Sequence, residues 1–190
     1  FNPSKIEILH NFVRLYGSPA QINGHKDYYC YIGRISSEKG IETLLEAAAG
    51  LPEYKLKIVG SGPLEKVLSS RNRSENVEFV GFKAGDELKS ILSGSRFLVV
   101  PSEVFENNPL TVLEALCLGI PVLGSDIGGI PELIFPDFNG MLFEAGNVKD
   151  MIEKIKYLWN NFIYFKQDEI IEDAQLRFNS ENFYNKLVNI

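Results

Sequence analysis

The chain has 190 residues, 45% of them hydrophobic and 23% charged, a composition that is typical of one globular α/β domain and excludes a disordered chain. Its formal net charge of −6 excludes nucleic acid as a partner, because binding to a phosphate backbone requires clustered cations. No apolar run in the sequence approaches the ~18 residues of a membrane-spanning helix.

The N-terminal part shows little regular pattern. Residues 5–15 alternate apolar and polar side chains, and residues 17–26 have the composition of a linker or loop. The N-terminus has no initiating methionine and no charged region followed by an apolar one. We therefore expect no signal peptide and a chain that is a piece of a longer protein.

From about residue 27 to residue 142, short apolar runs alternate with glycine or proline turns and amphipathic segments. This alternation with short loops predicts a Rossmann-like, doubly wound, mostly parallel sheet with helices on both faces. The expected strands are Tyr28–Ile32, Lys55–Val59, Val77–Val80, Phe97–Val100, Pro121–Gly124 and Gly140–Phe143. The expected helices are Gly40–Ala49, one from Leu64, Asp86–Leu92, one from Pro109 to Leu116 or Leu118, and a short one at Pro131–Ile134.

After residue 147 the pattern becomes helical. Helices are expected at Val148–Asn160, Glu169–Phe178 and Ser180–Val188, with Ser180 as the cap of the last one. We predict one domain over residues 1–190, of which residues 148–190 form a helical C-terminal segment.

The cysteines and histidines form no recognisable site. Cys30 and Cys117 lie in apolar strand and helix contexts, so we expect them to be reduced core residues in the cytoplasm. His10 and His25 are isolated, and no cluster of metal-binding residue types has the spacing of ligands. We therefore expect no metal.

The most informative stretch joins the fourth expected strand to the helix from Pro109. Asn108 precedes that proline, so its side chain is placed to cap a helix whose first residue is Pro109. The amides of Leu110 and Thr111 then have no partner within the helix. They point over the carboxyl edge of the sheet, where the helix dipole favours an anion such as a diphosphate.

Two carboxylates flank this anion site. Glu106 lies in the loop, and Glu114 lies about 7 Å along the helix axis. Two glutamates at this spacing are often no more than solvated surface residues. Their position in the crevice where open α/β sheets bind ligands favours a role in accepting hydrogen bonds from sugar and ribose hydroxyls.

A series of further loops follows a recognisable order between residues 5 and 145. The motifs are Tyr31-Ile-Gly-Arg34 through Lys39-Gly40, Ile58-Val-Gly60-Ser-Gly62-Pro63, Val77 through Gly81-Phe82, Val100-Pro101-Ser102, Glu106 through Glu114-Ala115, Gly119-Ile-Pro121-Val and Gly128-Gly129-Ile-Pro131-Glu132. Together they resemble the group 1 glycosyltransferases. The resemblance implies the C-terminal, nucleotide-sugar-binding half of a two-domain GT-B enzyme.

The resemblance also implies the roles of individual residues. Arg34 and Lys39 would pair with the donor diphosphate, Glu106 would address the donor sugar and Glu114 the ribose. Phe82 would belong to the loop that reads the base, although it is equally compatible with a core position. The implied catalytic residues are Glu106, Arg34 and Lys39. The implied donor-binding residues are Gly33, Gly60, Gly62, Phe82, Asn107, Asn108, Pro109, Leu110, Thr111 and Glu114, with Gly60 to Gly62 permitting close approach to the nucleotide.

The implied reaction is transfer of a glycosyl group from a nucleoside diphosphate sugar, with retention at the anomeric carbon and without a metal or cofactor. Uridine diphosphate is the first expectation for the donor and guanosine diphosphate the second. The acceptor would be a glycan or a lipid-linked molecule in polysaccharide biosynthesis. An N-terminal acceptor-binding domain, in cis or in trans, is expected but absent, so this chain should bind the donor without efficient transfer. We expect the protein to be cytoplasmic and, where the missing domain binds the membrane, to lie at its inner face.

Three alternatives compete with this interpretation. A sugar-nucleotide epimerase also binds such a donor, but the Glu106–Glu114 spacing argues against it. A non-catalytic nucleotide-sugar-binding subunit is compatible with the sequence. A receiver or dinucleotide-binding domain is disfavoured, because the first clear strand is followed by neither an acidic cluster nor a Gly-x-Gly-x-x-Gly turn.

Overall fold

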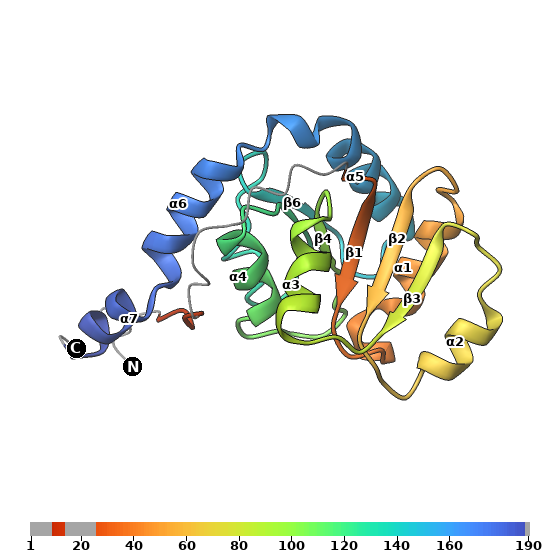
Figure 1. Ribbon diagram of the computed structural model, residues 1–190, viewed down its shortest axis with the longest axis horizontal. Helices are drawn as coiled ribbons and strands as arrows, with labels where there is room; N and C mark the ends of the chain where they lie inside the picture. Colours follow the sequence, from red (N-terminus) through yellow and green to blue (C-terminus); the bar gives the residue numbers. More distant parts are fainter. Residues whose placement is uncertain (1–8, 14–25, 189–190) are drawn as a thin grey trace.

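The computed structural model describes residues 9–13 and 26–188 and contains one six-stranded sheet (Figure 1). The strand order is β3-β2-β1-β4-β5-β6, and every neighbouring pair is parallel. This arrangement confirms the predicted Rossmann-like, doubly wound sheet. The strands are β1 (Tyr28–Ile32), β2 (Lys55–Val59), β3 (Val77–Gly81), β4 (Leu98–Val100), β5 (Val122–Ser125) and β6 (Gly140–Phe143).

The centre of the sheet is buried on both faces, which explains why its strands are continuous apolar runs in the sequence. Tyr31 of β1 lies in register with Ile58 of β2 and Val99 of β4, and all three side chains are buried. Cys30 is fully buried and Cys117 is half-buried, and both are free thiols. The predicted core role of the cysteines is therefore confirmed for Cys30 and holds in part for Cys117.

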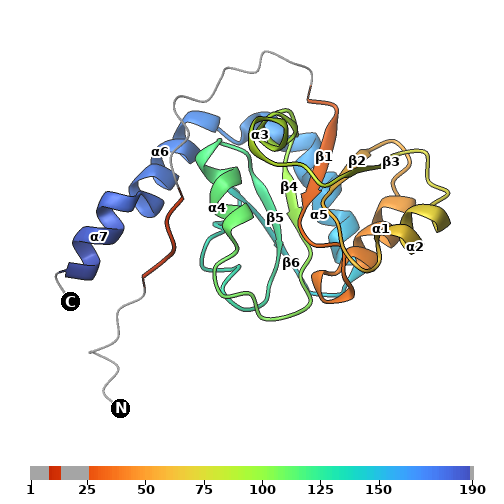
Figure 2. The same ribbon diagram turned by 60° about the horizontal axis from the view of Figure 1, so that its bottom comes forward.

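Helices cover both faces of the sheet. Helices α1 and α5 contact each other on one face, and α3 and α4 lie over the other (Figures 1 and 2). The helices are η2 (Ser37–Lys39), α1 (Ile41–Ala49), α2 (Glu65–Arg71), α3 (Gly85–Ser93), α4 (Leu110–Cys117), α5 (Val148–Asn161), η3 (Phe162–Tyr164), α6 (Gln167–Phe178) and α7 (Ser180–Val188).

The short helix expected at Pro131–Ile134 is wrong, because residues 131–133 form a turn. The cause is the fully buried side chain of Asn139. Its Oδ1 accepts from the Phe135 amide at 2.7 Å, and its Nδ2 donates to the Leu133 carbonyl at 3.1 Å. These bonds replace the backbone bonds with which a helix would continue.

Two predicted helix caps are also wrong. Helix α4 begins at Leu110, Pro109 is its cap residue, and Asn108 makes no capping bond. At α7, the amide of Asn182 donates to Asn179 Oδ1 at 2.7 Å, so Asn179 caps that helix and Ser180 is its first residue. In both cases the cap lies one residue from the predicted position. The ψ of 116° at Pro109 is extended, so the helix starts only at Leu110, and the side chain of Asn179 reaches the free amide of Asn182.

The C-terminal helices form an arm on the β6 side of the sheet. Helix α6 contacts α4, and α7 continues away from the body (Figures 1 and 2). Residues 9–13 run beside this arm, where the Val13 amide donates to the Phe178 carbonyl at 3.1 Å and Phe12 contacts Phe183. Most of the predicted alternating segment 5–15 and almost all of the linker 17–26 lie outside the described residues. No helix within the described ranges is long and apolar enough to cross a membrane.

Candidate functional site

The candidate site lies at the carboxyl ends of β1 and β4. The order of the strands reverses between these two neighbours, so the loops that follow them leave in opposite directions and open a crevice. Arg34 and Lys39 follow β1, and Glu106 lies in the loop between β4 and α4. The sheet therefore brings together residues that are far apart in the sequence.

Two adjoining cavities occupy this edge, and Ile32, Gly33 and Arg34 line both. The first has a volume of about 530 Å³, and its other lining residues are Val59, Gly60, Ser61, Gly62, Pro63, Phe82, Lys83 and Leu88. The second has a volume of about 370 Å³, and its other lining residues are Tyr31, Lys39, Val100, Pro101, Ser102, Glu106, Pro109, Leu110 and Thr111.

The wall of the first cavity is made of backbone segments in direct contact. Gly60 has a φ of 143°, and a Cβ there would lie 1.8 Å from the Gly33 carbonyl oxygen. A Cβ on Gly62 would lie 2.3 Å from the Ile35 carbonyl oxygen. Both glycines approach the chain's own backbone closely, and their predicted approach to a nucleotide stays a prediction.

Phe82 stands at the mouth of the first cavity, in the turn after β3. Its side chain is 72% exposed, so the alternative of a core position is wrong. Gly81 has a φ of 76° and accepts a hydrogen bond from the Gly60 amide, which ties the turn to the glycine loop. An exposed aromatic ring over a cavity is suited to stacking on a flat ring.

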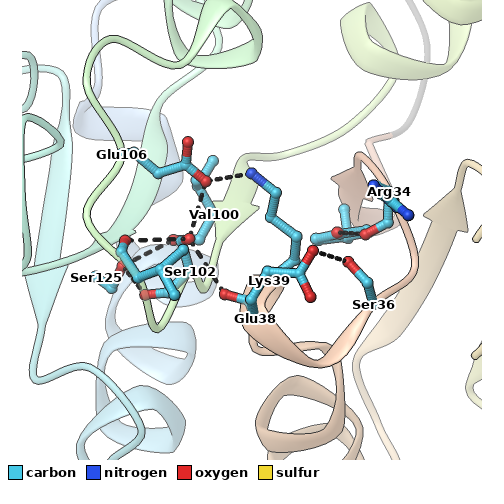
Figure 3. Close-up of polar contacts among 10 residues, drawn as sticks. Arg34, Ser36, Glu38, Lys39, Val100, Ser102, Glu106 and Ser125 are labelled. Carbon is cyan, nitrogen blue, oxygen red and sulfur yellow. Dashed lines mark hydrogen bonds and ion pairs between the residues drawn. The ribbon is translucent and has the colours of Figure 1, made fainter.

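Charged side chains meet in the second cavity. The Lys39 ammonium forms an ion pair with Glu106 Oε1, and Ser102 Oγ donates to the same oxygen at 2.9 Å (Figure 3). Two of the three predicted catalytic side chains, Lys39 and Glu106, are therefore in one place, and in this structure they bind each other.

The loop that carries Lys39 is held against the end of β4. Gly40 has a φ of 65°, and a Cβ there would lie 1.8 Å from the Pro101 carbonyl oxygen. The Glu103 amide donates to the Glu38 carbonyl at 3.0 Å. These backbone contacts explain why Lys39 reaches the loop of Glu106.

The loop that carries Glu106 is held from the other side by the Gly128-Gly129 turn. The Gly129 amide donates to the Glu106 carbonyl at 2.7 Å, and a Cβ on Gly129 would lie 1.9 Å from the Asn107 carbonyl oxygen. The buried hydroxyl of Ser125 donates to the Ser102 carbonyl at 2.7 Å. The position of Glu106 is thus fixed by packed backbone.

Arg34 lies apart from this ion pair, on the border of the two cavities (Figure 3). Its backbone is fixed by the buried Tyr31, whose hydroxyl donates to the Arg34 carbonyl at 2.6 Å. Its exposed guanidinium makes no hydrogen bond or ion pair with residues 9–13 or 26–188. The pKa of the Glu38 carboxyl is lowered, mainly by the hydrogen bond from Ser36. The charge of Arg34 lowers it further.

The first turn of α4 closes the second cavity. The Val112 amide donates to the Pro109 carbonyl, so the amides of Leu110 and Thr111 precede the first bond of the helix. Glu114 lies one turn farther on the face of Leu110 and does not line either cavity. It is half-buried, and burial raises the pKa of its carboxyl.

Asn107 and Asn108 line neither cavity. Asn107 is exposed, whereas the Asn108 amide nitrogen lies 3.1 Å from His10 Nδ1. Asn11 Nδ2 donates to the Asn108 carbonyl at 3.5 Å. The buried Asn108 Oδ1 has no partner in the described part of the chain. Asn108 therefore joins the loop between β4 and α4 to residues 9–13 instead of capping α4.

Five residues that support the site received no role from the sequence. Four of them occur in the quoted motifs, which is the only signal that could have found them: Tyr31, Gly40, Ser102 and Gly129. Ser125 is the last residue of β5, lies just beyond the predicted strand Pro121–Gly124, and gave no signal. No group of three or more potential metal-binding side chains occurs within the described residues.

Comparison with known proteins identifies relatives of the chain. Residues 18–177 match the family described as "Glycosyl transferases group 1". An uncharacterized glycosyltransferase of Methanocaldococcus jannaschii is 29% identical over 164 residues, which are 85% of this chain and 43% of that protein. The sulfoquinovosyl transferase of Arabidopsis thaliana is 35% identical over 136 residues, which are 70% of this chain and 26% of that protein.

A solved structure with the same architecture is that of a variant of TarM from S. aureus in complex with fondaparinux, α-GlcNAc-glycerol and UDP. It matches with a TM-score of 0.80 and 25% sequence identity, over 100% of this chain and 40% of TarM. The chain spans less than half the length of each of these three proteins.

Proposed function

Because the chain belongs to the group 1 glycosyltransferases, we propose that it binds the nucleoside diphosphate sugar from which such an enzyme transfers a glycosyl group. The observation that carries this proposal is the pair of adjoining cavities with Arg34 on their border. One cavity offers an aromatic ring and close backbone, and the other offers cations, a carboxylate and a helix N-terminus. These are the groups that a base, a diphosphate and a sugar require in turn.

The base belongs in the first cavity. Phe82 provides the aromatic surface there, and the glycine loop provides backbone groups near it. Uridine is the first candidate, and the TarM variant with UDP supports this choice by its likeness to the chain. Guanosine is the second.

The diphosphate belongs at the border, within reach of Arg34, Lys39 and the amides of Leu110 and Thr111. During transfer, the bond between the anomeric carbon and the β-phosphate oxygen breaks, and that oxygen keeps the electron pair. Fixed cations and the helix N-terminus stabilise the resulting charge, which is the largest electrostatic demand of the reaction. In this proposal these groups do so without a metal or cofactor.

The sugar belongs in the second cavity beside Glu106, and the ribose beside Glu114. Both carboxylates are acceptors for hydroxyl groups. Asn107, Asn108 and Pro109 act through the backbone that shapes this loop. We propose that transfer proceeds with retention at the anomeric carbon, and we assign no nucleophile.

The acceptor is the part of the reaction for which this chain has no proposed site. The chain spans less than half of its relatives, and we place the acceptor-binding part in an N-terminal domain, supplied in cis or in trans. A glycan or lipid-linked acceptor, in the cytoplasm or at the inner face of the membrane, fits this arrangement. Without that domain the chain binds the donor but transfers poorly, since the aligned acceptor is missing. A non-catalytic subunit that binds the same donor is the second candidate, because the groups that line the two cavities are all assigned to donor binding.

Calorimetric titration with UDP, GDP and ADP tests the donor site. We expect saturable binding of one nucleotide, UDP first, and a loss of about thirtyfold in affinity with Arg34→Ala, because a charge-assisted hydrogen bond is lost. The matched control is Arg71→Ala, which removes the same charge from the exposed end of α2. Equal effects of both substitutions, or no binding of any nucleotide, would overturn the proposal.

Addition of the acceptor-binding domain of a relative separates the two candidates. A catalytic half should then transfer sugar from the bound donor. A binding subunit should bind the donor and remain inactive.

A further inference from the structure

The two charges proposed to serve the donor neutralise each other in the structure. The Lys39 ammonium and the Glu106 carboxylate form an ion pair, with side chains that are 32% and 19% exposed. Glu106 is the less exposed partner, and its Oε1 also accepts from Ser102. Both charges are therefore partly withdrawn from water and satisfied by protein groups.

Backbone contacts hold the two loops that carry Lys39 and Glu106, so this ion pair is not a chance contact between two mobile surface side chains. Gly40 lies against Pro101 on the lysine side, and Gly129 binds the Glu106 carbonyl on the other side. Ser102 is 1% exposed and fixes the carboxylate oxygen. The pair between Lys55 and Asp27, by contrast, joins side chains that are more than half exposed.

Binding of a diphosphate changes the partners of both residues. If Lys39 turns to the phosphate, Glu106 loses its cation and stays partly buried near a second negative charge, which is unfavourable. A sugar on the diphosphate provides hydroxyl donors that replace the lost partner. A nucleoside diphosphate without a sugar provides none.

We propose that the Lys39–Glu106 ion pair weakens the binding of the free nucleoside diphosphate relative to its sugar conjugate. The pair is a specificity element that disfavours the product and favours the donor. This inference rests on the proposed function, because it assumes that the diphosphate and the sugar occupy the second cavity.

The first test compares the affinity for UDP of the native chain and Glu106→Gln. The amide keeps the size of the side chain and an acceptor for Ser102 but releases Lys39. We expect UDP to bind about fivefold tighter, and the preference for UDP-glucose over UDP to fall. Glu103→Gln is the matched control, because Glu103 lies in the same loop and contacts Thr43 instead of Lys39.

The second test separates competition for Lys39 from simple repulsion between Glu106 and the phosphates. In a Lys39→Ala background, Glu106→Gln should raise UDP affinity by less than about twofold, since only the repulsion between Glu106 and the phosphates is then relieved and no cation is released. An undiminished gain in this background would show repulsion alone and overturn the inference. Glu106→Ala serves as a second variant with the same expected direction if Glu106→Gln folds poorly.

The two levels of the proposal fail in different ways. If the native chain binds no nucleotide, the proposed function fails and the inference fails with it. If the native chain binds UDP and Glu106→Gln binds it equally or more weakly, only the inference fails.

Discussion

The two cavities at the edge of the sheet differ in the way in which they are formed. The first is walled by backbone segments whose contact requires glycine, with Gly60 against Gly33 and Gly62 against Ile35. The second is lined by charged and hydroxyl side chains that bind one another, with Lys39 on Glu106 and Ser102 on the same carboxylate.

This difference teaches which part of the site is preformed. The backbone contacts fix the glycine wall of the first cavity, so we expect a ligand to bind against that wall with little reorganisation. The side chains of the second cavity have to exchange partners before they can hold a ligand. Substitutions at the glycine wall of the first cavity should therefore act on stability, and substitutions of the paired side chains of the second cavity should act on ligand selection.

Gly60→Ala should produce the largest effect. The added Cβ would overlap the Gly33 carbonyl, and the positive φ disfavours any side chain, so we expect a loss of at least about 3 kcal/mol in the free energy of unfolding. Urea denaturation measures this loss. Gly85→Ala is the control, because its φ is 57° but a Cβ there would meet nothing within 4 Å, and about 1 kcal/mol is expected. Similar losses at both positions would break the comparison.

Glu114→Ala should leave the fold intact and weaken UDP binding by about 2 kcal/mol if Glu114 holds the ribose hydroxyls. Calorimetry measures the affinity, with Glu153→Ala on the exposed side of α5 as the control of equal charge. An unchanged affinity would show that Glu114 does not contact the nucleotide and that only residues lining the two cavities bind it.

Phe82→Ala sharpens the assignment of the base to the first cavity. Loss of stacking should weaken UDP binding by about 1 kcal/mol, and the unfolding free energy should stay the same, since the ring is 72% exposed. Phe105→Ala removes a more exposed ring, 84% accessible, from the loop that carries Glu106. If Phe105→Ala weakens UDP binding as much as Phe82→Ala, the base does not lie where we place it.

Protonation of His10 should have the smallest effect on stability. His10 contacts Asn108 in the loop between β4 and α4. Burial, followed by the charge of Arg177, lowers the pKa of His10; Lys186 lowers it further and Glu132 opposes the change. The folded chain then binds fewer protons than the unfolded chain. The contribution of His10 to the free energy of unfolding is therefore fully present above its unfolded pKa of about 6.5. It is lost as the pH falls below that value toward the lower pKa of the folded chain.

Urea denaturation of the native chain and His10→Gln at pH 7.5 and pH 5.5 checks this sign. The native chain should lose more stability than the variant on acidification. A larger loss in the variant would show that His10 is not responsible.

Local pattern was sufficient where short-range interactions decide the structure. The apolar runs predicted the strands, because parallel strands covered on both faces contain few polar residues. The order of glycine and proline motifs indicated the family and the residues around the crevice, and most of these line the two cavities. The predictions failed where a specific contact outweighed local propensity. The side chain of Asn139 binds backbone groups that a helix at Pro131–Ile134 would use. Asn179 caps α7 in place of Ser180, and Pro109 precedes α4 instead of starting it.

The sequence by itself determined the fold class, the family and the list of residues near the crevice, because these depend on periodicity and on motifs that are local in the chain. It did not determine which of these residues bind each other. Lys39 and Glu106 are 67 positions apart. They meet only because β1 and β4 are neighbours, the contact of Gly40 with Pro101 joins their loops, and Gly129 holds the Glu106 loop from the other side. The exposure of Phe82, the place of Glu114 outside both cavities and the link of Asn108 to His10 depend likewise on distant segments, so only the tertiary structure decided them.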